Sequence, residues 1–540
     1  MVTSPDDEGV AATSGANGDV ASSAMSTVAK GALILSLGTL VSRILGWYRE
    51  KLLLGTYGDS DINGAYIAAF NVPDLLYYLL AGGALGAAFI PVFSGYIAKG
   101  NQKDANKVGS TIANLMLVAI AVGTVIQLLF TPFFVRLIAP WYTPGSEVFT
   151  LTVNLTRILC FMVFFTALSG LLTGMLNSYH HFLATTLVWN TYNLGIIFGL
   201  LYLRQFEWGP HGIYGVALGV IIGAFSMVAI QFPVLCKYGF RYAPIMDLRH
   251  EGVRRVLTYF VPVMIAFTLG MATLQTIPGI LATKLGPPVV ADMRAATRLV
   301  LLPMGIFAVA ISTAAFPRLA QQVALGQTDE FRATLVHAIK AVLVLTIPAV
   351  VGIFVLAEPM NFLLWGGDEY GANGVRAASY ATMLLAAALL GLSLMQIVNR
   401  AFFSLGKNYV PMLVALGVVL VNIPLALWLM HTPLQYGGIS LAASVTLVLG
   451  CAVLIDLLRR QLGGINGRSI AILTAKVLLA STLMGVAVYF VARLEPLTPR
   501  FRYTETANLP AAELEALRQD DIGPHLRWAA PSVPETKSVG

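Results

Sequence analysis

Apolar stretches of about 20 residues recur along the whole sequence, and they restrict the fold more than any other feature. Each is long enough to cross the roughly 30 Å hydrocarbon core of a bilayer. Hydrophobic residues make up 57% of the 540 residues and charged residues only 11%, whereas soluble domains carry roughly 25% charged residues. The short alternating segments of a β-barrel are not seen. We therefore predict an all-α polytopic membrane protein.

Hydropathy predicts thirteen membrane spans. They cover residues 28–54, 66–96, 107–130, 148–176, 182–203, 211–236, 253–281, 292–321, 334–357, 376–404, 409–430, 436–459 and 469–493. Two further segments, 130–139 and 358–366, follow proline-marked breaks and are rich in aromatic and aliphatic residues. We predict that these two segments lie at the membrane interface.

Lysine and arginine alternate from one connection to the next, which predicts the orientation of the chain. Five of the alternate connections are basic, and they contain Lys99, Lys103 and Lys107; Lys237, Arg241, Arg249, Arg254 and Arg255; Arg318 and Arg332; Lys407; and Arg459, Arg460 and Arg468. Of the intervening loops, "APWYTPGSEV", "LWGGDEYGANG" and "HTPLQYGG" contain no Lys or Arg, and "RQFEWGPHG" contains only Arg204. Because cytoplasmic loops are enriched in Lys and Arg, we predict a cytoplasmic N-terminus. The net charge of +7 then reflects these loops and not nucleic-acid binding.

An internal repeat divides the spans into two sets of six. "FIPVFSGYIAKGNQKD" at 89–104 matches "FPRLAQQVALGQTDE" at 316–330, which aligns Pro91 with Pro317 and Gly100 with Gly326. An offset that contains six spans preserves orientation, so we expect two parallel six-helix lobes around a central cavity, an arrangement that recurs in transporters. The predicted parts are a disordered cytoplasmic tail (1–27), an N-lobe (28–236), a cytoplasmic linker (237–252), a C-lobe (253–461), an additional C-terminal helix (467–494) and a polar C-terminal tail (495–540).

The first span ends in the charged stretch "SRILGWYRE". Ionisable residues inside a membrane are costly and are functional candidates. Arg43 and Glu50 are seven residues apart and share one helix face, whereas Arg49 lies about 120° from Arg43. The two arginines could line two sides of a cavity if the helix bends at Gly46. The alternative is that Arg49, Glu50 and Lys51 extend to the interface.

Five other charged residues lie within or beside apolar spans. Asp74 follows Pro73, where it could cap a helix or pair with Arg43 or Arg49. Arg298, with Arg294 one turn before it, precedes Pro303, which should kink the span. For Arg298, cavity and interface positions both remain open, and so they do for Arg157 and Arg400, which occupy matching spans of the two lobes.

This arginine bias favours an anionic substrate. Arginine binds phosphate through a planar fork and stays charged when buried, whereas a cationic drug would require buried carboxylates and aromatic cages. The chain contains no HExxH, GxSxG or Walker motif, which are signatures of several enzyme classes. We therefore predict a transporter and not an enzyme, without a cofactor or a metal ion.

Three blocks of the sequence resemble one known family. "SRILGWYREKLLLGTYG", "AYIAAFNVPDLLYYLLAGGALGAAFIPVFSGY" and "RLVLLPMGIFAVAISTAAFPRLAQ" are similar to the MurJ (MviN) family of lipid II flippases, part of the multidrug/oligosaccharidyl-lipid/polysaccharide exporter superfamily. The likeness covers most of residues 28–493. It implies two six-helix lobes, an extra helix pair, and alternating access that carries an undecaprenyl-diphosphate-linked peptidoglycan precursor to the outer leaflet.

The resemblance also implies roles for individual residues. Arg43, Arg49 and Arg298 match the family's cavity arginines and are expected to hold the diphosphate or headgroup, with Glu50 and Asp74 as charge partners. Arg157, Arg294 and Arg400 are further cavity candidates.

The chain departs from the family pattern at several positions. Gly64 and Gly82 stand where many members have an acid, and Tyr77 and Tyr78 stand where many have basic residues. Span 253–281 has no carboxylate, so we do not expect the sodium site of some relatives. The family has fourteen spans, whereas the sequence here predicts thirteen.

Together these observations predict a lipid II flippase for cell wall synthesis and cell shape in the bacterial cytoplasmic (inner) membrane. Its expected partners are lipid II, membrane lipids and wall-synthesis enzymes. Two alternatives remain open: an exporter of another polyprenyl-linked oligosaccharide or of small molecules on the same fold, and a non-transporting scaffold for wall-synthesis enzymes.

Overall fold

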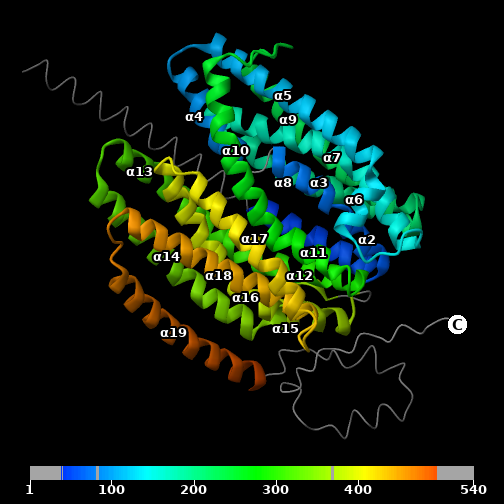
Figure 1. The fold of residues 1–540 in the computed structure, drawn as a ribbon. Helices are drawn as coiled ribbons and strands as arrows, with labels where there is room; N and C mark the ends of the chain where they lie inside the picture. Colours follow the sequence, from blue (N-terminus) through cyan, green and yellow to red (C-terminus); the bar gives the residue numbers. More distant parts are fainter. Residues whose placement is uncertain (1–37, 39, 81–83, 180, 367–369, 495–540) are drawn as a thin grey trace, which may run out of the picture. The chain divides into compact units, whose positions relative to one another are not determined.

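The computed structural model describes residues 38, 40–80, 84–179, 181–366 and 370–494. Within these ranges every regular element is a helix (Figure 1). Lipid offers no hydrogen-bonding partner to the backbone, so apolar spans satisfy their peptide groups internally as helices. The all-α prediction is confirmed.

After a helix over residues 40–57, the elements follow one another through the chain. The first half contains α2 (Asp61–Ala69), α3 (Asn71–Leu80), α4 (Ala84–Ala98), α5 (Gln102–Leu129), α6 (Thr131–Ile138), α7 (Glu147–Ser178), α8 (Phe182–Leu201) and α9 (Ile213–Lys237). The second contains α10 (Glu251–Met271), α11 (Ile277–Ala282), α12 (Pro287–Pro303), α13 (Val309–Ala324), α14 (Thr328–Val355), α15 (Ala357–Trp365), α16 (Ala372–Ser404), α17 (Tyr409–Leu429), α18 (Tyr436–Gln461) and α19 (Gly467–Leu494).

Eleven helical segments of the described chain are long and apolar enough to cross a membrane, from Gln102–Leu129 to Gly467–Val491. They correspond to the third to thirteenth predicted spans. The predicted span 28–54 begins outside the described residues. The predicted span 66–96 is divided among α2, α3 and α4, and residues 81–83 within it are not described.

Prolines lie at two of the places where a helix is interrupted. Pro73 has no N–H, so the carbonyl of Ala69 loses its helical donor; the hydroxyl of Thr156 donates to that carbonyl at 3.4 Å instead. The predicted kink after Pro303 is a π-helical turn, Met304–Ala308. A second π-helical turn, Ala272–Thr276, separates α10 from α11. The short helices α6 and α15 occupy the two segments that were predicted to lie at the interface.

The internal repeat extends to the helix boundaries. Adding 226 to the limits of α5 gives those of α14. The turns before these helices also match: Gly100 has φ +69° and Gly326 has φ +70°, a backbone conformation that glycine adopts without steric cost. In each turn the next N–H donates to the carbonyl five residues earlier, at 3.0 Å from Asn101 and 2.9 Å from Gln327. The aligned glycines therefore end helices in the same manner.

The chain forms two compact units that are not contiguous in sequence. Unit 1 comprises the described residues of Met1–Glu50, Leu76–Leu129 and Arg157–Met264. Unit 2 comprises those of Lys51–Leu75, Phe130–Thr156 and Ile265–Gly540. Two segments of the first repeat are thus grouped with the second repeat. The predicted lobe boundaries stay a prediction.

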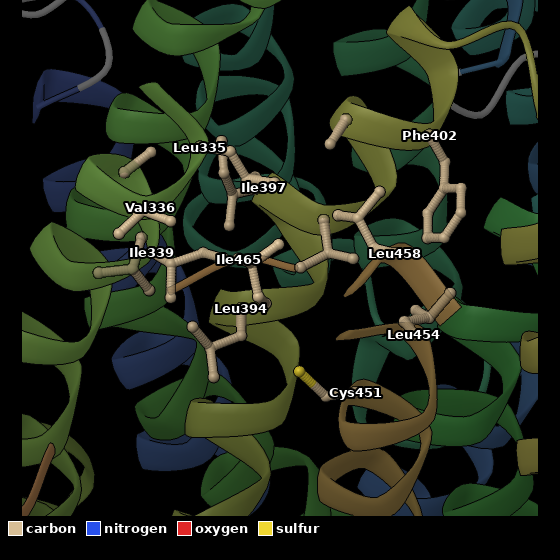
Figure 2. Close-up of a cluster of buried hydrophobic side chains, with 14 of the residues drawn as sticks. Leu335, Val336, Ile339, Leu394, Ile397, Phe402, Cys451, Leu454, Leu458 and Ile465 are labelled. Carbon is tan, nitrogen blue, oxygen red and sulfur yellow. The ribbon is translucent and has the colours of Figure 1, made fainter. Parts of the chain in front are cut away.

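The core of unit 2 is built by α14, α16 and α18 (Figure 2). Buried aliphatic side chains from these three helices interdigitate, including Leu335, Ile397 and Leu454. The additional helix α19 covers this core: Ile470 and Val477 pack against it, and Lys340 donates to Ser469 at 2.6 Å. The predicted polar tail 495–540 and the question of a fourteenth span lie outside the described residues.

Unit 2 also contains a close contact between α2 and α12. A Cβ atom built on Gly64 would lie 2.3 Å from the carbonyl oxygen of Pro287. No real Cβ atom approaches an oxygen so closely, so only glycine lets these two helices pack at this distance.

In unit 1, the residues after α9 run along a polar stripe of α5. The amide of Asn114 donates to the carbonyls of Ala243 and Ile245 at 3.2 and 2.7 Å and accepts from the hydroxyl of Tyr242 at 2.7 Å. The N–H of Ala243 donates to Ser110 at 3.1 Å. These bonds fasten this part of the predicted linker (237–252) to unit 1.

Lys107 of α5 and Asp247 of the predicted linker form an ion pair at the same contact, with 2.7 Å between the ammonium nitrogen and a carboxylate oxygen. The hydrogen bond from Lys107 lowers the pKa of Asp247. The contribution of the pair is therefore present above the ordinary carboxyl pKa and is lost as the pH falls through the lowered value.

We predict that Gly64→Ala lowers the free energy of unfolding by about 1–3 kcal/mol, because α2 and α12 must separate to accommodate the methyl group. Gly55→Ala is the matched control, since a Cβ there meets no atom within 4 Å and alanine favours a helix by up to about 1 kcal/mol. Unfolding in detergent micelles measures both. Equal stability of the two variants would show that the helices do not pack as described.

We predict that Asn114→Ala accelerates amide hydrogen exchange across residues 240–247, because three hydrogen bonds to the linker are lost. Lys103→Ala, an exposed change on the same helix, should leave exchange unaltered. Peptide-resolved exchange mass spectrometry reads both. Unchanged protection in the Asn114 variant would contradict the role assigned to this stripe.

Candidate functional site

The charged stretch of the first helix forms a compact polar cluster in unit 1. Arg49 binds Glu50 at 2.8 Å and donates its other terminal nitrogen to the amide oxygen of Asn193 at 2.9 Å. Glu50 is only 3% exposed. Such a buried carboxylate requires a positive partner, and Arg49 provides it. Arg49 and Glu50 are thus brought together.

Asn193 belongs to α8 and holds the first helix along one face. Its amide nitrogen donates to the carbonyl of Ser42 at 3.2 Å. One turn earlier, Asn190 donates to the carbonyl of Gly38 at 3.4 Å. The helix continues through Gly46, which lies close to Asn193: a Cβ atom there would be 3.7 Å from the amide nitrogen of Asn193, an ordinary contact distance. The guanidinium of Arg49 is therefore oriented by an amide on a neighbouring helix.

Arg43 is half-buried on the same helix. Among the described residues, none forms a hydrogen bond or ion pair with its guanidinium. Arg49 uses its terminal nitrogens to bind Glu50 and Asn193. The N–H donors of Arg43 have no such partner among the described residues.

A second cluster lies in unit 2 and combines one acid with two arginines. Arg294 and Arg298 are four residues apart on α12, which places them on one helix face. Both are half-buried and both act electrostatically on Asp74 of α3. The guanidinium of Arg294 lies 5.4 Å from the ring centre of Phe70, a cation–π contact.

Asp74 lies in the first turn of α3 and not at its N-cap, since α3 begins at Asn71. The capping interpretation is therefore wrong, because the N–H of Asp74 already bonds to the carbonyl of Phe70 within the helix. Its arginine partners in unit 2 come from α12. The pairing with Arg43 or Arg49 stays a prediction.

The other two arginines have different surroundings. Arg157 is an exposed side chain of α7 in unit 1. Arg400 is half-buried near the end of α16 in unit 2, 5.8 Å from the ring centre of Phe316. Neither belongs to the two clusters, and their predicted role in a cavity stays a prediction.

Sequence reasoning missed Asn190 and Asn193. The signal was present, because two amides three residues apart interrupt the otherwise apolar stretch 182–203. Polar side chains inside a membrane usually bond to another helix. Only the fold shows that the partner is the first helix.

The unit 2 cluster contains two arginines and one acid, and in unit 1 Arg43 lies on the same helix as the Arg49–Glu50 pair. A pair of guanidiniums on one helix face can offer forked donors to a diphosphate or a carboxylate. The arrangement fits binding of an anion and offers no nucleophile or acid–base pair for catalysis.

Comparison with known proteins adds an independent observation. A family model described as lipid II flippase MurJ matches residues 54–498. The chain belongs to the lipid II flippase MurJ family. The family resemblance predicted from sequence is confirmed.

Curated relatives in the MurJ family match over most of the chain. The lipid II flippase MurJ of Burkholderia cenocepacia is 26% identical over 433 residues, which cover 79% of this chain and 83% of the relative. The probable lipid II flippase MurJ of Rhizobium tropici is 28% identical over 467 residues, which cover 85% and 86%.

Solved structures agree on the fold. A lipid II flippase MurJ in an inward closed conformation matches with TM-score 0.68 at 20% identity, covering 85% of this chain and 97% of that chain. An inward-facing multidrug resistance MATE family transporter of the MOP superfamily matches with TM-score 0.62 at 14% identity, covering 80% and 98%. At these identities the likeness shows the two-lobe helical fold alone.

The departure from the MurJ pattern at Gly64 has a structural reason. The carbonyl of Pro287 occupies the space that a side chain would need. The acid that many members carry at this position would not fit between α2 and α12 as they pack here.

We predict that Asp74 and Arg298 are energetically coupled. In a double-mutant cycle of Asp74→Asn and Arg298→Gln, the coupling should be roughly 0.5–3 kcal/mol, because removing either partner leaves the other charge in a partly buried site. The cycle of Asp74→Asn with Arg400→Gln is the control and should be additive. Unfolding in detergent measures both cycles, and additivity in the first would contradict the electrostatic interaction of Arg298 with Asp74.

Proposed function

We propose that this chain is a lipid II flippase that moves an undecaprenyl-diphosphate-linked peptidoglycan precursor from the inner to the outer leaflet. Family membership over residues 54–498 carries this proposal. The excess of arginine over acid in the two clusters supports it, since the diphosphate of such a lipid is anionic. It is a transporter and not an enzyme.

The proposed location is the bacterial cytoplasmic (inner) membrane, with the N-terminus in the cytoplasm. The alternation of basic and neutral connections supports this orientation. The connections before α2, α12, α16 and α18 would then face outward, and the segment fastened to α5 would face the cytoplasm. A role in cell shape follows if the cargo is the precursor of the wall.

The proposed mechanism is alternating access between the two repeats. A long polyprenyl tail can remain in lipid while only the charged headgroup crosses through a polar path. In unit 2, α12 bears Arg294 and Arg298 and packs against α2 through Gly64, so movement of α12 would expose or withdraw both guanidiniums together. A neighbouring acid can compete with a bound anion for the arginines, and Asp74 lies within electrostatic reach of both.

We assign Arg43, Arg49 and Arg298 to diphosphate or headgroup binding, with Glu50 and Asp74 as charge partners. Arg43 has the donors least engaged by the protein. Arg49 is held by Glu50 and Asn193, so its role is to present one oriented cation. Wall-synthesis enzymes would receive the lipid at the outer surface.

The test is complementation in a strain depleted of its own lipid II flippase, scored by labelled lipid II at the outer leaflet. The chain should restore it, and the Arg43→Ala, Arg298→Ala double variant should reduce it roughly tenfold or more, since charged hydrogen bonds contribute about 1.5–3 kcal/mol each. Arg376→Ala, an exposed change on α16, is the matched control.

Three outcomes would contradict parts of the proposal. Normal membrane insertion and full activity of the double variant would refute the role of the arginines. Movement of another lipid-linked sugar but not of lipid II would refute the cargo. Restored growth without any change in lipid exposure would favour a scaffold.

A further inference from the structure

Unit 2 contains a buried acid that the proposed transport mechanism does not use. Asp292 of α12 is 4% exposed. Its carboxylate accepts a hydrogen bond of 2.7 Å from the hydroxyl of Tyr370, which is itself 0% exposed. An isolated ionised carboxylate in such surroundings is very costly, so its charge must be neutralised.

No cation among the described residues performs this task. The groups that act electrostatically on Asp292 are Tyr370, Asp59 and Tyr436, and none of them is positive. Two basic residues belong to neighbouring segments: Lys284, in the turn that precedes α12, and Arg376 of α16, which packs against α12. Both have exposed side chains. Asp59 is acidic and adds repulsion to any negative charge on Asp292.

Tyr436 is a third polar group in the surroundings of Asp292. Tyr436, at the start of α18, is 4% exposed, and its hydroxyl is buried without a hydrogen-bond partner among the described residues. Tyr436 and Asp292 interact electrostatically. A buried hydroxyl seldom lacks a partner, and a protonated carboxyl can both donate to it and accept from it, whereas an ionised carboxylate can only accept.

The position of Asp292 relates this site to the arginines on the same helix. Asp292 and Arg294 are two residues apart, so their side chains leave α12 about 160° from each other. Pro287, Arg294 and Arg298 lie within about 20° of one face, which meets Gly64 of α2 and Phe70. The opposite face bears Asp292 and meets Tyr370, which precedes α16.

We propose that Asp292, Tyr370 and Tyr436 form a proton-binding site that controls how tightly α12 packs against its neighbours. Through α12, the site controls how far Arg294 and Arg298 are exposed to a ligand. The proton binds one carboxylate oxygen of Asp292, while the hydroxyl of Tyr370 donates to the other. Loss of the proton leaves an uncompensated negative charge near Asp59, on the face of α12 that bears Asp292, and weakens the packing of that helix. The link to transport rests on the proposed function; the proton site itself does not.

Infrared spectroscopy of the full chain in lipid tests the site without any substrate. At neutral pH the wild type should show the C=O stretch of a buried carboxylic acid, shifted by deuteration and lost in Asp292→Asn. Asp61→Asn, which changes an exposed acid of α2, is the matched control and should retain the band. Absence of the band in the wild type, or its persistence in Asp292→Asn, would overturn the proposal.

A second variant decides the question if Asp292→Asn does not fold. Tyr370→Phe removes the hydroxyl that donates to the carboxyl and should shift the same C=O band. An unshifted band in a folded Tyr370→Phe protein would overturn the assignment.

The coupling to transport has its own readout in proteoliposomes with labelled lipid II. The wild-type rate should depend on pH by up to about tenfold per pH unit, as for a step controlled by one proton, and Asp292→Asn should flatten this profile. An unchanged profile in Asp292→Asn would refute the coupling. Failure of the wild type to move lipid II at any pH would refute the proposed function, whereas the infrared result would still decide the proton site.

Discussion

The constraint on which this structure depends is that a peptide backbone in lipid must satisfy its own hydrogen bonds. It turns each apolar run of sufficient length into a helix and leaves irregular backbone only where other protein groups can repair it. Thr156 repairs the carbonyl that Pro73 leaves open, and π-helical turns follow Pro303 and Met271. The interruptions in α2–α3 and α12–α13 thus arise at defined residues, and the candidate charges lie beside them.

The same constraint makes every charge in the bundle costly unless another group compensates it. The chain compensates its charges in three different ways. Arg49 neutralises Glu50 and is oriented by an amide of α8. Arg294 and Arg298 both act electrostatically on the one acid Asp74. Asp292 has hydroxyl groups and an acid around it, and a proton is the partner that we infer. Helix α12 carries the second and third arrangements on opposite faces.

Several residues of the two clusters were already candidates from the sequence. The arginines at 43, 49, 294 and 298 were candidates because a charge in an apolar run is conspicuous. Pro303 indicated that the helix bearing Arg294 and Arg298 is interrupted after them. Asn193 and Asp292 were not recognised. An amide within an apolar span or an acid at its end has several structural explanations, and only the neighbouring helix decides among them. The position of Asp74 inside the first turn of α3 likewise depended on where that helix begins.

The sequence by itself determined the helical class, the number of spans from 107 onward and the repeat at an offset of 226, because hydropathy and helix-ending glycines act locally. Tertiary structure decided which charges share an environment. It placed Asp74 with two arginines of α12, Asn193 with Arg49, and Tyr370 with Asp292. These residues are separated by 78 to 224 positions in the chain, and no local pattern specifies contacts between helices so far apart.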